Sequence, residues 1–143
     1  MQYPEAVYTC STNSPMEKVW SDAIDLFAKR GYSIKIIDKS SGLLNSSPIS
    51  MMDHYTYENR KGELRDSSAY IVTSRQIIDP TEVSAELYVR ITSENDHTFI
   101  QVKLLNVRSI CTIPGTSTTS AIVEINEALS TGILEKEIAK WLQ

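Results

Sequence analysis

The chain has 143 residues, of which 41% are apolar and 22% are charged, and its formal net charge is −4. These values are typical of a globular protein, and we expect residues 1–143 to form a single domain. Nucleic-acid binding is disfavoured, because phosphate contacts need a basic surface and Lys and Arg never occur here in runs longer than two. No apolar stretch approaches the roughly 18 residues of a membrane-spanning helix, so no transmembrane segment is expected.

The clearest local pattern is a helix near the N-terminus. Ser14, Pro15 and Glu17 stand where an N-cap, a first helical residue and the partner in a capping box are expected. Apolar residues then recur at helical spacing, and Gly31 suits the left-handed residue that follows many helices. The sequence therefore predicts a helix over residues 15–30.

Strand signals surround this helix. Apolar and polar residues alternate at 6–10 before it and at 32–36 after it, and the turn residues 38–42 lead into a third strand that begins at Leu43. β-forming residues predict a fourth strand over 68–77. Because short turns separate these segments, we expect neighbouring strands to pair antiparallel.

The best-patterned strands form a hairpin over residues 83–104. In its first strand one parity is apolar and the other is polar, as expected for a strand with one buried face. Beyond the polar loop 93–97, the second strand continues the buried face, whereas Tyr88 and Phe99 fall on the outward parity. The residues expected to be buried are Val83, Ala85, Leu87, Val89, Ile91, Ile100, Val102 and Leu104.

The last segment is predicted to be a helix over residues 120–142, with Ser120 as its N-cap and Gly132 in its middle. Its apolar residues recur along one helical stripe from Ile122 to Ile138. The predicted order is therefore β-α-β-β-β-β-β-α. This order indicates an α+β fold: a twisted antiparallel sheet of five or six strands with two helices, about 15–30 and 120–142, packed on one face.

The stretch from Ser14 to Leu44 resembles a known group of proteins. Its parts are the capped helix that ends in Lys29-Arg30-Gly31-Tyr32, the strand 33–37 and the turn 38–44. These parts are similar to those of bacterial envelope domains with a TATA-binding-protein-like β-α-β4-α fold. That group includes the lipoprotein accessory subunit of the outer-membrane β-barrel assembly machinery and uncharacterised secreted domains of Bacteroidetes-type bacteria.

The resemblance implies a fold and a compartment but no activity, because its motif is structural and contains no catalytic residue. It implies a location in the periplasm or cell envelope, while a cytoplasmic location stays open. Members of this group often carry a lipid anchor, which here would lie outside residues 1–143.

The sequence contains no pattern typical of a catalytic or metal site. His54 follows Asp53, but neighbouring residues of a strand point to opposite faces, so the two are not expected to act as a pair. His97 lies in a polar loop, and neither Cys10 nor Cys111 belongs to the short-spaced ligand pair of a zinc site. We therefore expect no enzyme activity, no bound metal and no cofactor.

Two interpretations of Cys10 and Cys111 stay open. Each ends a predicted strand just before a predicted helix, so both can lie at one end of the sheet. A disulfide there would close a loop of about 100 residues and would require an oxidising compartment. Without it, both cysteines are small buried hydrophobic residues.

These observations favour a non-enzymatic binding or scaffold domain of the bacterial cell envelope that acts on a protein partner. The contact surface would be the open sheet face together with an arm at residues 51–66, because Met and aromatic residues are enriched at interfaces. The alternative for Met51, Tyr55 and Tyr57 is that they continue the apolar parity of the third strand and belong to the core. The candidate partner-binding residues are Met51, Tyr55, Tyr57, Tyr88 and Phe99.

The alternative is a carrier of a small apolar ligand. In a helix-grip arrangement, a cavity between the C-terminal helix and a curved sheet holds the ligand. Gly132, Ala121, Ala128 and Ala139 would provide the necessary space between the two.

Overall fold

The computed structural model describes residues 7–59, 61–74 and 79–143. Within these residues the protein has two helices and ten strands, which confirms the predicted α+β fold. Their order along the chain is β1 (Val7–Thr12), α1 (Met16–Arg30), β2 (Ile34–Asp38), β3 (Leu43–Ser46), β4 (Ile49–Ser50), β5 (Tyr55–Tyr57), β6 (Ile71–Thr73), β7 (Glu82–Glu94), β8 (His97–Ile113), β9 (Ile122–Asn126), β10 (Ala128–Ser130) and α2 (Ile133–Leu142).

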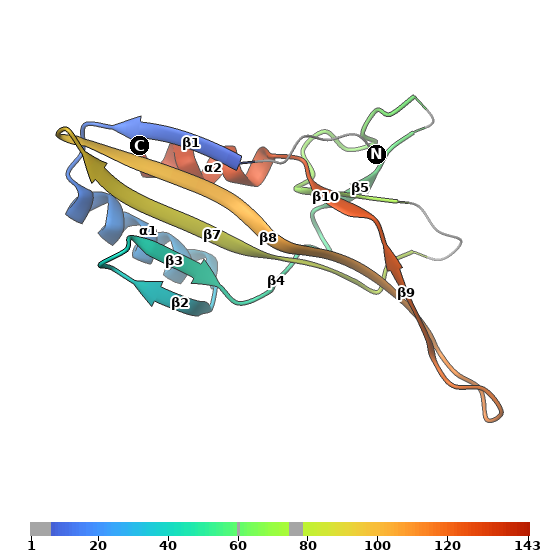
Figure 1. Cartoon of the computed structure of the whole chain (residues 1–143). Helices are drawn as coiled ribbons and strands as arrows, with labels where there is room; N and C mark the ends of the chain where they lie inside the picture. The colour runs from blue at the N-terminus through green and yellow to red at the C-terminus, as the bar shows by residue number, and fades with distance from the viewer. Residues whose placement is uncertain (1–6, 60, 75–78) are drawn as a thin grey trace.

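The main sheet is antiparallel and is organised around the long hairpin of β7 and β8 (Figure 1). Its strand order is β1-β8-β7-β3-β2, while β4 also pairs with β7 and β9 also pairs with β8. Because β8 is 17 residues long, it pairs with β1 along its first part and with β9 along its last part. Within the described residues the sheet therefore has seven strands, more than the five or six predicted. Strands that are neighbours in the sheet are also not always neighbours in the chain, as β1 and β8 show.

The apolar parity predicted for this hairpin is confirmed on both strands. On β7 every apolar residue of that parity is at most 1% exposed, and on β8 both Ile100 and Val102 are fully buried. Leu104 is half-buried and packs against the same core. The buried apolar residues of β7 are Val83, Ala85, Leu87, Val89 and Ile91.

A β-bulge gives β8 one extra residue relative to β7. Ser84 pairs with Arg108 and Glu86 with Leu105, so three steps along β8 match two along β7. Asn106 lies within the bulge at φ 52°, a left-handed conformation that Asn adopts more readily than most residues. The buried residues of β8 include Ile100 and Val102 before the bulge and Ser109 and Cys111 after it.

Helix α1 forms where the sequence predicts it, but its N-terminus differs. Gly31 follows the helix in the left-handed conformation, as expected. The predicted capping box is absent: the N-cap position is Pro15, and no side chain caps the helix. The reason is that Pro15 has an extended ψ of 145°, so the helix begins one residue later than predicted and its cap position has no side-chain acceptor. The Ser14 carbonyl oxygen accepts a 2.7 Å hydrogen bond from Thr98 Oγ1 of the sheet. Glu17 instead accepts a 2.8 Å hydrogen bond from Lys39 Nζ.

The predicted helix over 120–142 is wrong in its first half. Residues 122–126 and 128–130 form strands β9 and β10, and α2 begins only after Gly132. Ser120 lies in the exposed loop between β8 and β9 and caps no helix. The spacing of Ile122, Ile125 and Leu129 fits a helix, but the β-branched residues around Glu124 favour a strand paired with β8.

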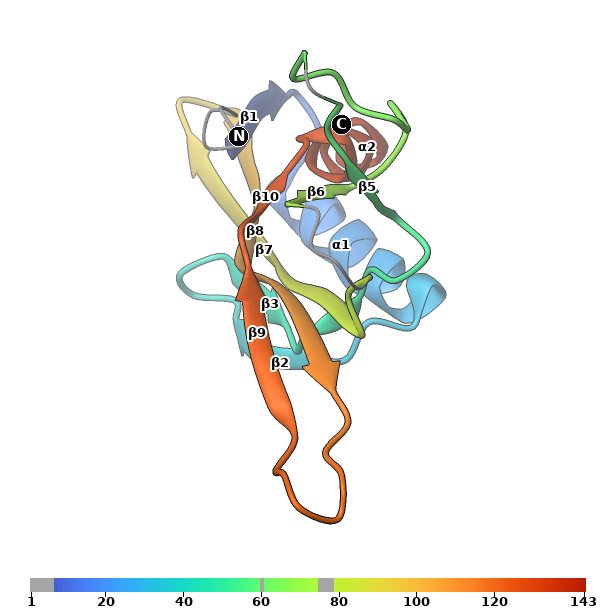
Figure 2. The same cartoon turned by 90° about the vertical axis from the view of Figure 1, so that its right-hand side faces the viewer.

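Both helices lie on the same side of the main sheet, as predicted (Figure 2). Buried side chains of α1 and α2 join the inward residues of β7 and β8 in one hydrophobic core. The helical members of that core are Val19, Trp20, Ala23, Leu26, Phe27, Leu134, Ile138, Ala139 and Leu142.

A second, smaller sheet has the strand order β10-β6-β5. Strands β5 and β6 pair in parallel, although the sequence predicts antiparallel pairing of neighbouring strands. The third strand predicted from Leu43 is divided into β3, β4 and β5. Pro48, which has no N–H group for the ladder, separates β3 from β4, and a turn over residues 51–54 separates β4 from β5. Of the fourth strand predicted over 68–77, residues 71–73 form β6, and 75–77 lie outside the described residues.

Of the two interpretations of Cys10 and Cys111, the disulfide is not formed, and both cysteines are free. Cys10 pairs with Ile100 across β1 and β8, whereas Cys111 lies eleven residues further along β8. At about 3.3 Å per residue this separates the two by roughly 36 Å along the strand, and a disulfide needs Cα atoms within about 7 Å. Cys111 is buried and Cys10 is half-buried, which matches the second interpretation. Burial raises the pKa of the Cys10 thiol.

Candidate functional site

The five predicted partner-binding residues do not form one surface. Met51 is 1% exposed, so its side chain is part of the core and is not available to a partner. Tyr55 and Tyr57 lie half-buried on β5 in the small sheet, with their rings in an edge-on contact at 5.8 Å. Tyr88 and Phe99 lie on β7 and β8 of the main sheet. Tyr57 Oη also donates a 2.6 Å hydrogen bond to Asp79 Oδ1, and its pKa is raised by burial and then by this bond.

Tyr88 and Phe99 belong to what we call the open face, the side of the main sheet opposite the helices. No element among the described residues covers this side (Figure 2). Pairing between the strands places Tyr88 opposite Lys103 and Thr92 opposite Phe99, with Arg90 opposite Gln101 between them. The open face therefore presents aromatic, cationic and neutral polar side chains in adjacent rows.

A shallow depression of about 430 Å³ lies on the open face around Phe99. Phe99 is 36% exposed, and β1, β7 and β8 together form the depression. Within the part of the chain that the structure describes, Arg90 makes no ion pair and no side-chain hydrogen bond, which leaves its guanidinium free for a ligand. The lining residues are Thr9, Arg90, Thr92, Phe99, Ile100 and Gln101.

The charge on this part of the open face differs from that of the whole chain. The chain has a net charge of −4, yet Arg90 and Lys103 are both cationic. Lys103 Nζ lies 4.6 Å from the centre of the Tyr88 ring, a cation–π contact that holds both side chains against the sheet. A partner with carboxylates is therefore favoured at this position over one with a basic surface.

A carboxylate network fixes the strands beside the depression. Glu86 Oε1 accepts hydrogen bonds from Lys35 Nζ at 3.2 Å and from Asn45 Nδ2 at 3.0 Å, while Oε2 accepts one from Asn106 Nδ2 at 2.7 Å. These bonds lower the pKa of Glu86, the bond from Asn106 most strongly. They connect β2, β3, β7 and the bulge in β8, so the open face is held rigid at this end.

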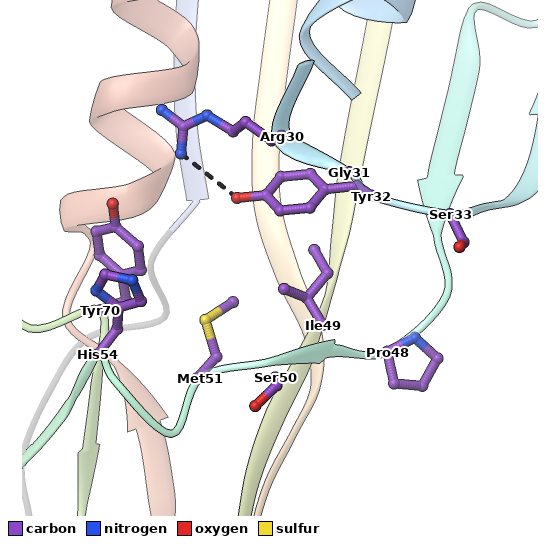
Figure 3. A pocket seen from close by; sticks show the side chains of 10 residues that line it. All are labelled: Arg30, Gly31, Tyr32, Ser33, Pro48, Ile49, Ser50, Met51, His54 and Tyr70. Carbon is purple, nitrogen blue, oxygen red and sulfur yellow. Dashed lines mark hydrogen bonds between the residues drawn. The ribbon is translucent and has the colours of Figure 1, made fainter. Parts of the chain in front are cut away.

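A second hollow of about 460 Å³ lies beside the C-terminal end of α1 (Figure 3). Ile49 and Met51 point into the space between Tyr32 on one side and the rings of His54 and Tyr70 on the other. The hollow has an apolar floor and aromatic walls, an arrangement that suits a small amphipathic molecule. Its lining residues are Arg30, Gly31, Tyr32, Ser33, Pro48, Ile49, Ser50, Met51, His54 and Tyr70.

Charged and phenolic groups border this hollow. Arg30 Nη1 donates a 3.4 Å hydrogen bond to Tyr32 Oη, and Arg30 Nη2 lies 3.7 Å from Glu137 Oε2. Tyr70 Oη donates a 2.8 Å bond to the same Glu137 oxygen, and its pKa is raised by burial and by that carboxylate. His54 stacks on Tyr70 with ring centres 4.4 Å apart. The arrangement can bind polar groups, but it contains no base held against a nucleophile.

Sequence reasoning found part of these sites. Parity alone placed Tyr88 and Phe99 on the outward side, and the same argument applied to Arg90 would have added it to the candidates. The hollow at the end of α1 was missed, because Tyr32, His54 and Tyr70 come from separate segments that meet only in the folded chain. Asp53 and His54 lie in the turn between β4 and β5, so the strand geometry on which the prediction rested does not apply to them.

No group of three or more His, Cys, Asp or Glu residues among the described residues is arranged to hold a metal ion. In that same part of the chain, neither helix has the length and apolar composition needed to cross a membrane. The chain matches no protein-family model, and comparison with curated proteins gave no significant match.

Proposed function

We propose that this chain is a non-enzymatic binding domain that recognises a partner protein through its open face. The observation that carries the proposal is that Arg90 and Phe99 line a depression on an uncovered sheet, with Tyr88 two residues before Arg90 on β7. Aromatic residues and Arg are enriched where proteins bind one another, and they dominate the binding energy of such contacts.

The partner that fits this surface has an apolar side chain next to carboxylates. Phe99 provides an apolar contact in the depression, and Arg90 can form paired hydrogen bonds with a carboxylate. The 51–66 segment belongs to the small sheet, and its exposed apolar residue is Met52 instead of Met51. We retain that segment as a secondary contact, and the proposed location in the bacterial envelope rests on the sequence resemblance alone.

A photo-reactive amino acid at position 99 tests this proposal. Introduced in the cells that make the protein, it is expected to form an adduct with a discrete partner, whereas the same group at Lys136, exposed on α2, is expected to form none. With the purified partner, Phe99→Ala and Arg90→Ala should each weaken binding about tenfold in calorimetry, and Lys136→Ala should leave binding unchanged. An adduct at position 136 but not at 99 would move the contact to the helical side and overturn the proposal.

The second candidate function is binding of a small amphipathic ligand. The residues expected to provide space beneath the C-terminal helix are dispersed, since Ala121 lies in a loop and Ala128 on β10. The observation that favours a ligand is instead the hollow of about 460 Å³ at the end of α1. Native mass spectrometry of the purified protein should then show a bound molecule that Ile49→Trp releases. A chain that carries no molecule before or after this substitution contradicts the carrier function.

A further inference from the structure

The hollow beside the C-terminal end of α1 presents a positive charge and hydrogen-bond donors to a ligand. Its described lining residues include Arg30 and His54, and none of them is Asp or Glu. The chain as a whole has a net charge of −4, so the lining of this hollow differs in charge from the molecule that surrounds it. A ligand with a negative charge and acceptor atoms is therefore favoured here over a cation.

Two donor groups at the edge of the hollow have capacity left for a ligand. Arg30 Nη1 donates a 3.4 Å bond to Tyr32 Oη, and Arg30 Nη2 lies 3.7 Å from Glu137 Oε2. Both distances exceed the roughly 2.7–2.9 Å of a strong bond between a guanidinium and a carboxylate. Tyr32 Oη is the acceptor in the first contact, so within the described part of the chain its own O–H hydrogen is left for a ligand.

The hollow is held open by backbone hydrogen bonds on each of its sides. Tyr32 N donates a 2.9 Å bond to Phe27 O, and the two rings meet edge-on with centres 5.9 Å apart. On the opposite side Tyr70 N donates a 2.8 Å bond to His54 O, and these two rings stack. Met51 N donates a 2.7 Å bond to β7, which ties the floor to the main sheet. Walls that are already in place lose little entropy when a ligand binds.

We propose that this hollow binds a small aromatic carboxylic acid in its ionised form. The carboxylate would accept paired bonds from the Arg30 fork and a further bond from the Tyr32 hydroxyl. The ring would lie between Tyr32 and the stacked pair of His54 and Tyr70 (Figure 3). The volume of about 460 Å³ is near the lower end of the roughly 300–1,000 Å³ of small-molecule sites, which suits a ligand of one or two rings.

The side chains around the hollow favour an aromatic ring over an aliphatic chain. Aromatic rings on two opposite sides give a flat ligand offset or edge-on ring contacts, which add to the free energy of burying its area. Ile49 and Met51 point into the space between these sides and form an apolar floor (Figure 3). A Met sulfur also makes favourable contacts with aromatic rings.

Glu137 favours an anion with a single charge. It is not among the lining residues of the hollow, and its Oε2 already accepts a 2.8 Å bond from Tyr70 Oη. Because this carboxylate lies 3.7 Å from Arg30, it offsets part of the guanidinium charge. A phosphate, with close to two negative charges at neutral pH, would meet more repulsion than a carboxylate with one. The inference rests on the second candidate function, ligand binding in this hollow, and does not depend on the open face.

Calorimetric titration with 2-naphthoate and its uncharged match 2-naphthamide tests the assignment. We expect the carboxylate to bind about tenfold more tightly than the amide, because a hydrogen bond between two charged groups is stronger than one to a neutral group. Arg30→Gln should bring the two affinities to within about twofold of each other. Lys29→Gln is the matched control: it removes the neighbouring cation, which lies 5.6 Å from the Trp141 ring and does not line the hollow, and should keep the preference.

Nuclear magnetic resonance of the methyl groups locates the bound probe. The naphthalene ring should shift the signals of Ile49 and Met51, and it should leave the signal of Ile100 at the open-face depression unmoved. Ile49→Trp fills the hollow and should abolish binding of both probes, while circular dichroism melting confirms that each variant is folded.

The possible failures of this test are distinguishable. Equal affinity for acid and amide, with shifts at Ile49 and Met51, would overturn the carboxylate assignment and leave ligand binding in the hollow intact. Tighter binding of 2-naphthyl phosphate than of 2-naphthoate would overturn the preference for a single charge. If neither probe shifts these two methyl signals at about 1 mM, both the assignment and the second candidate function are contradicted.

Discussion

Gly42→Ala is expected to lower the free energy of unfolding by more than about 4 kcal/mol, among the largest effects of a single substitution. Gly42 ends the turn between β2 and β3 at φ 71°, a conformation that costs other residues about 1–2 kcal/mol. An added Cβ would lie 1.8 Å from the carbonyl oxygen of Ile91 and 2.8 Å from its carbonyl carbon. Ile91 belongs to the central strand β7, and its N–H donates a 2.8 Å bond to the Gly42 carbonyl, so the two backbones cannot separate without breaking the sheet.

Gly31→Ala is the matched control for this substitution. Gly31 has almost the same φ, 72°, but a Cβ there would meet nothing within 4 Å. We expect this variant to lose about 1–2 kcal/mol from backbone strain alone. Urea denaturation of both variants separates steric clash from strain. Equal losses in the two would show that the contact between Gly42 and Ile91 contributes nothing.

Glu135→Gln is expected to raise the free energy of unfolding by about 1–3 kcal/mol at pH 8 and to make it less dependent on pH. Glu135 lies in the first turn of α2 and is fully buried. Its Oε2 accepts a 2.5 Å hydrogen bond from Ser130 Oγ, but Oε1 has no partner among the described residues. Burial raises the pKa of this carboxyl group, so the folded protein binds its proton more tightly than the unfolded chain does.

The sign of the pH effect follows from that difference. The contribution of Glu135 to stability is complete below the unfolded pKa of about 4.3 and is lost as the pH rises through the higher pKa of the folded state. Glu17→Gln serves as the control, because the Glu17 side chain is 78% exposed and no comparable change is expected. Urea denaturation from pH 4 to pH 8 measures both variants. A wild-type protein that becomes more stable than Glu135→Gln as the pH rises would contradict the prediction.

The sequence predicts best those parts of the fold whose contacts are local. Helix α1 and the hairpin of β7 and β8 each follow one periodicity over many residues, and both form as expected. The segment after Ser120 fails because its apolar spacing fits a helix and a strand equally well. Its conformation is decided by pairing with β8, a contact that the segment itself does not specify.

The same reasoning explains the outcome for the candidate site residues. Tyr88 and Phe99 were placed on the open face because their strands pair without interruption from Glu86 to Glu94 and from His97 to Leu105, outside the bulge. Met51 was assigned to an exposed arm because Met and aromatic residues are enriched at interfaces, whereas the parity that it shares with Ile49 favours the core, where the structure buries it. The hollow beside α1 depends on His54 meeting Tyr70, which no local pattern predicts.

The bulge at Asn106 makes the orientation of the β8–β9 hairpin beyond it, residues 109–126, depend on a single residue. Before the bulge, even-numbered residues of β8 such as Val102 are buried on the core side of the sheet, whereas after it odd-numbered residues such as Ser109 and Cys111 are buried there. Gaining or losing one residue between the bulge and Ser109 would turn the whole distal ribbon over, so that a buried thiol faced water. Length changes in the loop 114–121 do not alter which residues of β8 are buried. The tip of the hairpin therefore tolerates changes in length that would reverse its two faces if they occurred at its base.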